Sequence, residues 1–322
     1  MPPLIQYTLF SNEGRDEISE TFSEHERIVV QTGDALEVLS ALPPDLVTLI
    51  VTSPPYNLGK SYETRVDLAA YLRAQEPIIE QLVRVMHPQG HLCWQVGNYI
   101  EDGEVVPLDC LYHPLFSRHG LKLRRRCLWH YAHGLHEKRR FSGRYETLSL
   151  YTKAEFLPAR LPALGDPLPE SPSQLSAASS AAERIAFAQR EWAREVWDIP
   201  NVNSSHSEKT EHPCQFPIEL VERCVLVLSD EDDWILDPFC GVGAALVAGL
   251  KYRRRVIGCD KEARYTTLTK ERIVAFLQGK LPMRAMGTPI YVPSKREKIT
   301  QSPSEWRKEV TAHQRQTLFQ EG

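Results

Sequence analysis

The chain has 322 residues, enough for one large α/β domain with an insertion or for two domains. It is 42% hydrophobic and 25% charged, as in soluble globular proteins, and no apolar run approaches the roughly 20 residues of a membrane span. The net charge of −4 argues against polyanion binding over the whole surface. The seven scattered cysteines lack a CxxC pair, and the start of the chain lacks a signal-peptide pattern, so we expect reduced thiols and a cytoplasmic location.

The first residues, 1–24, are polar and without a clear period, and we expect an arm. Residues 28–31 then predict a short strand, and 35–42 predict a short helix. Gly33 and Asp34 lie between the two elements. An acidic residue just after a strand could hydrogen-bond a cofactor or cap the helix, and the sequence leaves both interpretations open.

A buried strand that ends on two prolines is the most informative stretch of the first half. Residues 46–51 form an apolar, β-branched run, which is typical of a parallel strand buried on both faces. Pro54 and Pro55 end the strand, because neither can donate to a ladder. Ser53 and Tyr56 are therefore expected just past the carboxyl end of a strand, where open α/β sheets bind ligands. A plain proline-rich turn is the competing interpretation.

The next segments continue an alternation of helix and strand. Residues 66–86 have helical spacing, with Pro77 as a candidate break or kink, and the segment 87–90 is expected to stop the helix. Residues 91–96 then predict a buried strand. Alternating helices and strands favour a mostly parallel sheet flanked by helices.

Residues 118–144 carry nine positive charges against one acid, Glu137, with Trp129, Tyr131 and Phe141 interleaved. Cationic groups neutralise phosphates and aromatic rings offer stacking surfaces, so the stretch favours nucleic-acid binding with a strong salt dependence. A solvated edge with packing aromatics is the alternative.

A repeat of potential metal ligands overlaps the basic stretch, and its members are Cys127, His130, His133 and His136. The segment reads as a strand followed by a loop, so these side chains need not converge on one ion. We predict no metal site.

The composition changes after a strand predicted at 147–152. Residues 154–182 hold five prolines and many Ala and Ser, which is typical of an insertion or linker. A charged helix is expected over 181–197, and a polar irregular stretch follows it. The next helix opens at 216 with a proline in its first turn.

A βαβ unit with a glycine turn follows, with a strand at 234–236, a small-residue helix at 244–250 and a strand at 255–259. Asp237, Pro238, Phe239, Gly241 and Gly243 form the turn, and Asp260 lies 19 residues beyond Gly241. Glycines admit a close ligand, and an acid at the second strand end suits ribose hydroxyls, so the unit predicts a nucleoside cofactor. Leu246 stands where a dinucleotide fingerprint needs its third glycine. Asp237 suits a cationic ligand without phosphate.

In their order, the Ser-Pro-Pro-Tyr motif and the later glycine loop resemble the β group of amino-group DNA methyltransferases, a circularly permuted arrangement. The resemblance spans roughly residues 28–279. It implies a Rossmann-like α/β fold with a mostly parallel sheet, an inserted target recognition region, and S-adenosyl-L-methionine as cofactor. It implies catalytic roles for Ser53, Pro54, Pro55 and Tyr56. It implies cofactor binding by Asp34, Asp237, Pro238, Phe239, Gly241, Gly243 and Asp260.

The chemistry of amine methylation suits the motif that resembles this family. The exocyclic amine of a base is a poor nucleophile, and the base must leave the stack to be reached. Tyr56 can stack on the flipped base, while Ser53 Oγ and the Pro54 carbonyl accept from its amine. Transfer would be direct, with catalysis by positioning and electrostatics.

Serine at the first motif position is associated in this family with cytosine N4, and aspartate with adenine N6. We therefore expect N4-cytosine methylation of a specific sequence in duplex DNA, with N6-adenine methylation as the alternative, because Asn57 is frequent in adenine enzymes. Pro213-Cys214 is similar to the cytosine-C5 nucleophile loop, but it precedes the glycine loop and no Glu-Asn-Val partner motif occurs. A nicotinamide oxidoreductase and a non-catalytic DNA-binding module are the remaining alternatives.

The resemblance also divides the chain. We expect an arm (1–24), a catalytic half (25–153), a target recognition insertion (154–205), a cofactor-binding half (206–279) and a C-terminal extension (280–322). The expected partners are double-stranded DNA and a cognate restriction endonuclease, with no membrane. The recognition sequence, the oligomeric state and the role of 280–322 do not follow from these residues.

Overall fold

The structure is a computed structural model that describes residues 17–60, 63–131, 143–153, 175–176 and 178–290. Its strands are β1 (Ile18–Ser19), β2 (Ile28–Thr32), β3 (Val47–Thr52), β4 (Met86–Val96), β5 (Asn98–Glu101), β6 (Glu104–Pro107), β7 (Lys122–His130), β8 (Tyr145–Thr152), β9 (Val196–Asp198), β10 (Trp234–Asp237) and β11 (Arg255–Asp260). Its helices are α1 (Ala35–Ala41), α2 (Leu68–Val85), α3 (Leu108–Arg118), α4 (Ala181–Trp192), α5 (Ile218–Leu228), α6 (Ala244–Lys251) and α7 (Ala263–Leu277).

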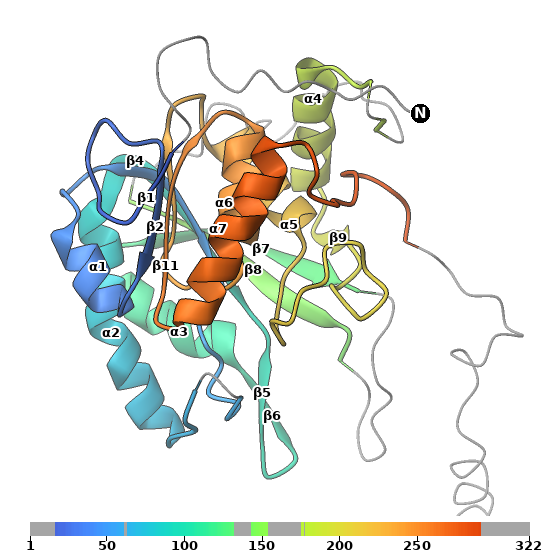
Figure 1. The fold of residues 1–322 in the computed structure, drawn as a ribbon. Coiled ribbons are helices and arrows are strands. Elements are labelled where there is room, and N and C mark those ends of the chain that lie inside the picture. Colours follow the sequence, from blue (N-terminus) through green and yellow to red (C-terminus); the bar gives the residue numbers. More distant parts are fainter. Residues whose placement is uncertain (1–16, 61–62, 132–142, 154–174, 177, 291–322) are drawn as a thin grey trace, which may run out of the picture.

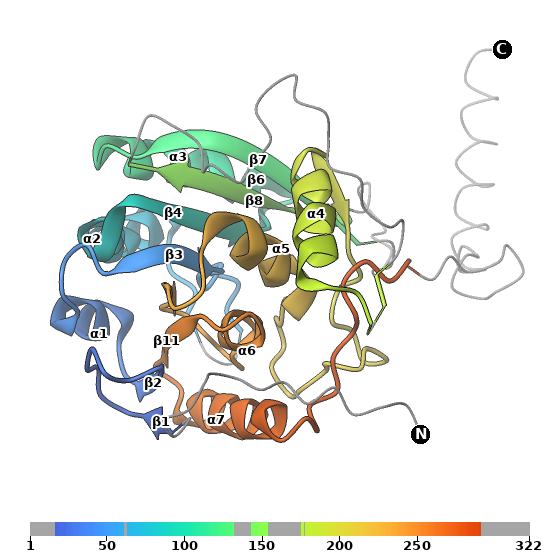
Figure 2. The same ribbon diagram turned by 90° about the horizontal axis from the view of Figure 1, so that it is seen from above.

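One nine-stranded sheet organises the fold, in the order β1-β2-β11-β10-β3-β4-β8-β7-β9. All neighbours pair in parallel except β8, which runs antiparallel to β4 and β7. Helices α1, α2 and α3 cover one face, and α4 to α7 cover the other (Figures 1 and 2). This confirms the expected Rossmann-like architecture with a mostly parallel sheet.

Alternating side chains of the central strands build the two core layers. Leu49 and Val51 of β3 pack toward α5 and α6, whereas Ile50 packs with the side chains of α2 and α3. Successive side chains of a strand point to opposite faces, so an unbroken apolar run is what a strand with helices on both sides requires. The apolar run at 46–51 predicts a buried parallel strand for this reason, and β3 lies in the middle of the sheet.

The order of strands reverses between β3 and β10. The chain passes from β3 through α2 to β4 on one side, and from β10 through α6 to β11 on the other. At such a switch point the loops diverge and leave a crevice beyond the carboxyl ends of the strands. A hydrogen bond joins the carboxyl ends of β3 and β10, because Thr52 Oγ1 donates to Asp237 Oδ1 over 2.6 Å. Residues far apart in sequence thereby meet at one site.

Helix α2 is not broken at Pro77, a candidate break or kink, and it continues through this residue. Tyr71, Ile79, Leu82 and Val85 are buried, and this packing holds the helix although proline removes one backbone donor. The segment 87–90 lies within β4 and accounts for an irregular register, in which Val47 pairs with Met86 but Leu49 pairs with His91.

Five elements are not predicted by the sequence. Strands β5 and β6 and helix α3 fill the stretch between β4 and β7, and β1 lies inside the expected arm and pairs in parallel with β2. The helix expected over 181–197 ends at Trp192, and strand β9 follows it. Strands of two to four residues are too short for a periodic signal. Among the described residues, no helix combines the length and apolarity needed to cross a bilayer.

Candidate functional site

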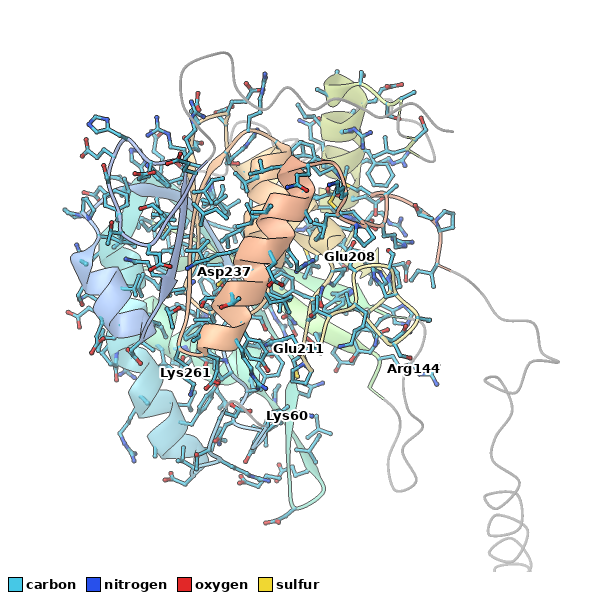
Figure 3. All side chains as sticks on the ribbon, viewed as in Figure 1. Lys60, Arg144, Glu208, Glu211, Asp237 and Lys261 are labelled. Carbon is cyan, nitrogen blue, oxygen red and sulfur yellow. The ribbon has the colours of Figure 1, made fainter. Side chains whose placement is uncertain are left out.

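A cavity of about 570 Å³ opens at the switch point of the sheet. Sequence-predicted residues from both halves of the chain line it: Asp34, Ser53, Pro54, Pro55, Tyr56, Pro238, Phe239, Gly241 and Asp260. Two lysines, Lys60 and Lys261, border it at the same end of the molecule (Figure 3). Asp237 and Gly243 belong to the same predicted set. Both are buried, and neither is among the residues that line the cavity.

Asp237 is fully buried under the cavity, at the end of β10. Its Oδ1 accepts from the hydroxyl of Thr52 and, over 3.1 Å, from the backbone N–H of Phe239. Its Oδ2 has no hydrogen-bond partner among the described residues. Burial raises the pKa of Asp237 to about 7. A buried carboxylate oxygen without a partner is costly, and a positively charged group of a ligand would satisfy it.

The glycine loop is held by the carboxylate at the end of β11. Asp260 Oδ2 accepts from the N–H of Gly241 over 3.1 Å, and Oδ1 accepts from the N–H of Glu262 over 2.8 Å. On the neighbouring strand end, Asp34 Oδ1 accepts from the N–H of Leu36 over 2.8 Å and caps α1. Asp34 therefore caps the helix and also lines the cavity, so the two interpretations of this residue are compatible.

Gly243 shows why the loop needs glycine. Its φ is +74°, and a Cβ at this position would lie 2.6 Å from Thr269 Cγ2. We expect Gly243→Ala to lower the free energy of unfolding by about 1–3 kcal/mol, because a left-handed backbone strain adds to a contact with buried Thr269. Urea denaturation would measure this.

The matched control for this substitution is Gly120→Ala. Gly120 has a similar φ of +80°, but a Cβ added at this position would meet no atom within 4 Å. That variant should lose only the strain component, about 1 kcal/mol. Equal losses in the two variants would contradict a role for the close packing around Gly243.

Hydrogen bonds from α2 and within the loop that follows hold the Ser-Pro-Pro-Tyr motif in place. The Tyr71 hydroxyl donates to the Pro55 carbonyl over 2.6 Å. The side chain of Asn57 bridges to Val66, donating to its carbonyl over 2.7 Å and accepting from its N–H over 2.8 Å. Glu63 accepts from the N–H of Asn57 over 2.9 Å. The loop is therefore pre-organised, and the amide of Asn57 is used within it.

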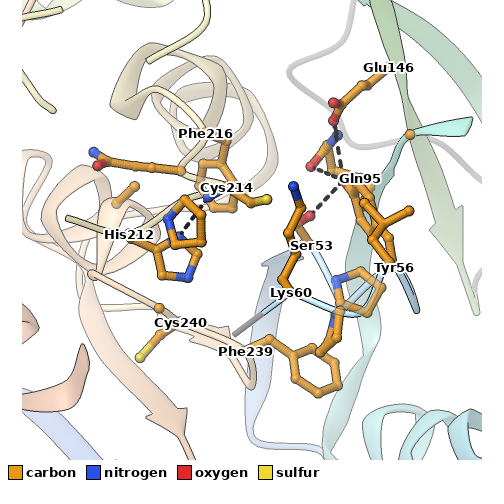
Figure 4. A pocket seen from close by; sticks show the side chains of 18 of the residues that line it. Ser53, Tyr56, Lys60, Gln95, Glu146, His212, Cys214, Phe216, Phe239 and Cys240 are labelled. Atoms are coloured by element: carbon orange, nitrogen blue, oxygen red, sulfur yellow. Dashed lines mark hydrogen bonds between the residues drawn. The ribbon is translucent and has the colours of Figure 1, made fainter. Parts of the chain in front are cut away.

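Two polar residues that sequence reasoning missed face the motif, Gln95 of β4 and Glu146 of β8 (Figure 4). The Tyr56 hydroxyl lies 2.8 Å from Ser53 Oγ and can donate its one proton either to Gln95 Oε1, 2.9 Å away, or to Glu146 Oε2, 3.2 Å away. Gln95 Nε2 also donates to Glu146 Oε2. The sequence does offer a sign of Gln95, because it is the one amide in the buried run 92–96. A buried amide must find hydrogen-bond partners.

Across the cavity, His212 packs against the glycine loop (Figure 4). A Cβ at Gly241 would lie 3.2 Å from His212 Nε2, and the imidazole meets the Tyr265 ring edge-on at a centroid distance of 4.4 Å. Burial lowers the pKa of His212 to about 4, so its ring is neutral at neutral pH. Cys214 lines the same cavity.

The aromatic residues of the basic stretch contribute to both the core and the cavity. Trp129 is largely buried, and its Nε1 donates to the Ile199 carbonyl over 2.8 Å. Arg126 forms an ion pair with Asp109. Trp129 and Tyr131 both line the cavity, while Phe141 lies outside the described residues.

The repeat of potential metal ligands does not converge in the part that can be followed. Cys127 is buried in the core, and His130 Nδ1 lies 2.8 Å from Asp198 Oδ1. His133 and His136 lie outside the described residues. Among the described residues, no three His, Cys, Asp or Glu side chains are grouped as metal ligands would be.

Comparison with known proteins adds independent evidence. The model of the N6/N4 DNA methylase family matches residues 47–271. Type II methyltransferase M.BglII of Bacillus subtilis is 34% identical over 273 residues, 78% of this chain and 70% of that protein. DNA adenine methyltransferase YhdJ of Escherichia coli K12 is 26% identical over 75% of this chain and 81% of its own length. Among solved structures, TTHA0409 of Thermus thermophilus, complexed with S-adenosyl-L-methionine, has a TM-score of 0.57 and 25% identity over 79% of this chain and 98% of that chain.

Proposed function

The chain belongs to the N6/N4 DNA methylase family, and on that premise we propose that it methylates the N4 amine of cytosine at a specific sequence in duplex DNA. That it is a DNA methyltransferase that uses S-adenosyl-L-methionine follows from the family and from the similar structure that binds this cofactor. The choice of base is the step that the proposal adds.

The single observation that carries the choice of base is the hydroxyl of Ser53 beside the cofactor cavity. It stands at the end of β3, 2.8 Å from the hydroxyl of Tyr56. In this family serine at that position is associated with cytosine N4 and aspartate with adenine N6.

Adenine N6 is the second candidate, and the similarity to YhdJ favours it. Asn57 gives it less support than its position in the sequence suggests. The side-chain amide of Asn57 is bonded to the backbone of Val66 on both its oxygen and its nitrogen, and the residue is only 2% exposed. An amide that is occupied and buried in this way is not placed to read a base.

The residues around the cavity fit the implied cofactor. The unpartnered Oδ2 of Asp237 suits the positive charge of its amino group, and Asp260 at the end of β11 suits ribose hydroxyls. When bound, the cofactor supplies a methyl group attached to a sulfonium. Ser53 Oγ and the Pro54 carbonyl would accept from the amine of the flipped base, and the Tyr56 ring would stack on it.

Nucleoside mass spectrometry of duplex DNA incubated with the protein and S-adenosyl-L-methionine tests this proposal. N4-methylcytosine is the expected product. N6-methyladenine alone would assign the second candidate. A product methylated at cytosine C5 would instead make Cys214 the nucleophile, and Cys214→Ser would then abolish activity.

Two further parts of the proposal concern the DNA and its readout. We place target recognition in 154–205, of which residues 154–174 and 177 lie outside the described residues. Helix α4 within it packs on the main core through Phe187 and Trp192. A restriction endonuclease with the same target sequence is the partner that the proposal implies.

A further inference from the structure

A hydrogen-bonded path leads from the motif serine to a carboxyl group. The Tyr56 hydroxyl lies 2.8 Å from Ser53 Oγ and 3.2 Å from Glu146 Oε2 (Figure 4). Gln95 borders this second link, because its Oε1 lies 2.9 Å from the Tyr56 hydroxyl and its Nε2 donates to Glu146. Four side chains, from the loop after β3 and from strands β4 and β8, are thereby joined beside the cofactor cavity.

Methylation of an exocyclic amine requires that one proton leave. The nitrogen becomes positively charged as it forms its new bond to carbon, and loss of a proton restores a neutral amine. A serine hydroxyl is too weak a base to keep this proton at neutral pH, but it can accept a proton while giving its own to a neighbour. A carboxylate at the end of such a path can keep the proton.

We propose that Glu146 is the terminal acceptor of the proton that the target amine loses, and that the proton reaches it through Ser53 Oγ and the Tyr56 hydroxyl. This inference rests on the proposed function. When bound, the cofactor would supply the methyl group, and its sulfur would keep the electron pair of the broken carbon–sulfur bond. As the carbon–nitrogen bond forms, the amine N–H bond breaks toward Ser53 Oγ. The Ser53 proton passes to Tyr56, and the Tyr56 proton passes to Glu146 Oε2. The products are a neutral methylated base, a neutral thioether and a carboxylic acid, which later releases its proton to water.

The surroundings of Glu146 suit this role. The titratable groups that face it are the phenols of Tyr56 and Tyr131, and among the described residues no cation forms an ion pair with it. Burial raises the pKa of Glu146, so its carboxylate holds a proton more firmly than an exposed glutamate does. Burial also raises the pKa of Tyr56 well above its ordinary value, so the phenol passes a proton on without remaining ionised.

Close packing at Gly97 keeps the path in place. A Cβ at this position would lie 3.2 Å from Tyr56 Cε2 and 3.3 Å from Glu146 Cδ. The absent side chain lets the tyrosine and the glutamate approach each other at the end of β4.

The test is the rate of methyl transfer in a single turnover, with the full-length protein in excess over duplex DNA. Saturating S-adenosyl-L-methionine keeps the protonation of Asp237 from affecting the rate. The wild-type rate should fall as the pH is lowered and Glu146 becomes protonated. Glu146→Gln should be slower by about 10²-fold and should lose this acid limb, whereas Glu146→Asp should restore part of both.

Tyr56→Phe provides a second, independent variant because it keeps the ring and removes the link. It should show the same loss of rate and of the acid limb, and the double variant should be no slower than either single variant. Glu104→Gln, an exposed residue of β6, is the matched control and should behave as wild type. If Glu146→Gln fails to fold, Tyr56→Phe decides. A wild-type rate and pH profile in either folded variant would overturn the proton path.

Nucleoside mass spectrometry of the same reactions separates this inference from the proposed function. A wild-type product of N6-methyladenine would overturn the choice of base. In that case, loss of the acid limb in Glu146→Gln would still support the path, and retention of the limb would still overturn it.

Discussion

Asp237→Asn should bind S-adenosyl-L-methionine about 10²- to 10³-fold more weakly than wild type, as measured by titration calorimetry. The asparagine oxygen can still accept from Thr52 and from the N–H of Phe239, so the loop geometry is kept. What changes is the second position, where an amide N–H₂ replaces the unpartnered oxygen Oδ2. A donor at that position repels a cationic group where the carboxylate attracts it. Asp237→Ala should abolish binding, because it also removes the acceptor for both hydrogen bonds.

The pH dependence of cofactor affinity provides a second measurement at the same residue. Burial raises the pKa of Asp237 to about 7, so the carboxylate is neutral below this pH and charged above it. A neutral carboxyl cannot pair with a cation. Wild-type affinity should therefore rise as the pH increases through about 7, while Asp237→Asn should stay weak without that rise. The matched control is Asp102→Asn at the exposed turn between β5 and β6, where φ is +48° and asparagine is tolerated. An affinity of Asp237→Asn equal to that of wild type would contradict a cationic partner for this residue.

The central part of the fold could be predicted from the sequence because the strands there are buried on both faces. An apolar run such as 46–51 fits no other place in an α/β protein than the middle of a parallel sheet. The turn after β10 could also be predicted from its glycines. Gly243 has a φ of +74°, which few other residues adopt, so a glycine at this position indicates such a turn. The order of these two segments along the chain, the motif after β3 first and the glycine turn after β10 second, also predicted the fold and the place where they meet.

The polar partners of the motif could not be predicted, because they depend on strand pairing. Glu146 is the second residue of β8, which pairs antiparallel with β4 and thereby comes next to Gln95 and Gly97. Nothing in the sequence near residue 146 specifies that partner strand. Antiparallel insertion of a strand into a parallel sheet is decided by tertiary packing, so no role for Glu146 followed from the sequence.

For the aromatic residues of the basic stretch, the sequence left two interpretations open. Composition alone does not distinguish a stacking ring from a packing ring, whereas β7 buries most of Trp129 and satisfies its indole N–H with a backbone carbonyl. Alternation along a strand places every second side chain on the buried face, and the position of the first residue in β7 determines which ones these are. A count of charges and rings does not contain that information.

Ser53→Ala should slow methyl transfer in a single turnover by about 10²- to 10³-fold, while the affinity for S-adenosyl-L-methionine stays unchanged. In our proposal, Ser53 Oγ accepts from the target amine and passes the amine proton to Tyr56, and both functions become important only as the nitrogen gains charge. The change therefore affects the transition state more than the bound ground state, and the rate constant should fall without a matching change in binding. Ser40→Ala, on α1, is the matched control, since the exposed Ser40 hydroxyl donates to the Leu36 carbonyl of its own helix.

The comparison of Ser53→Ala with Glu146→Gln divides the two roles of the serine. If Ser53 acted only as the entry to the proton path, the two variants would lose the same rate, and combining them would cost nothing more. If Ser53 also orients the amine, Ser53→Ala should be the slower of the two, because alanine removes the acceptor as well as the path. We expect the latter order, since in our proposal Ser53 is the member of the path that contacts the target amine. An unchanged rate in Ser53→Ala would contradict both roles at once and would leave the Pro54 carbonyl as the sole acceptor of the amine.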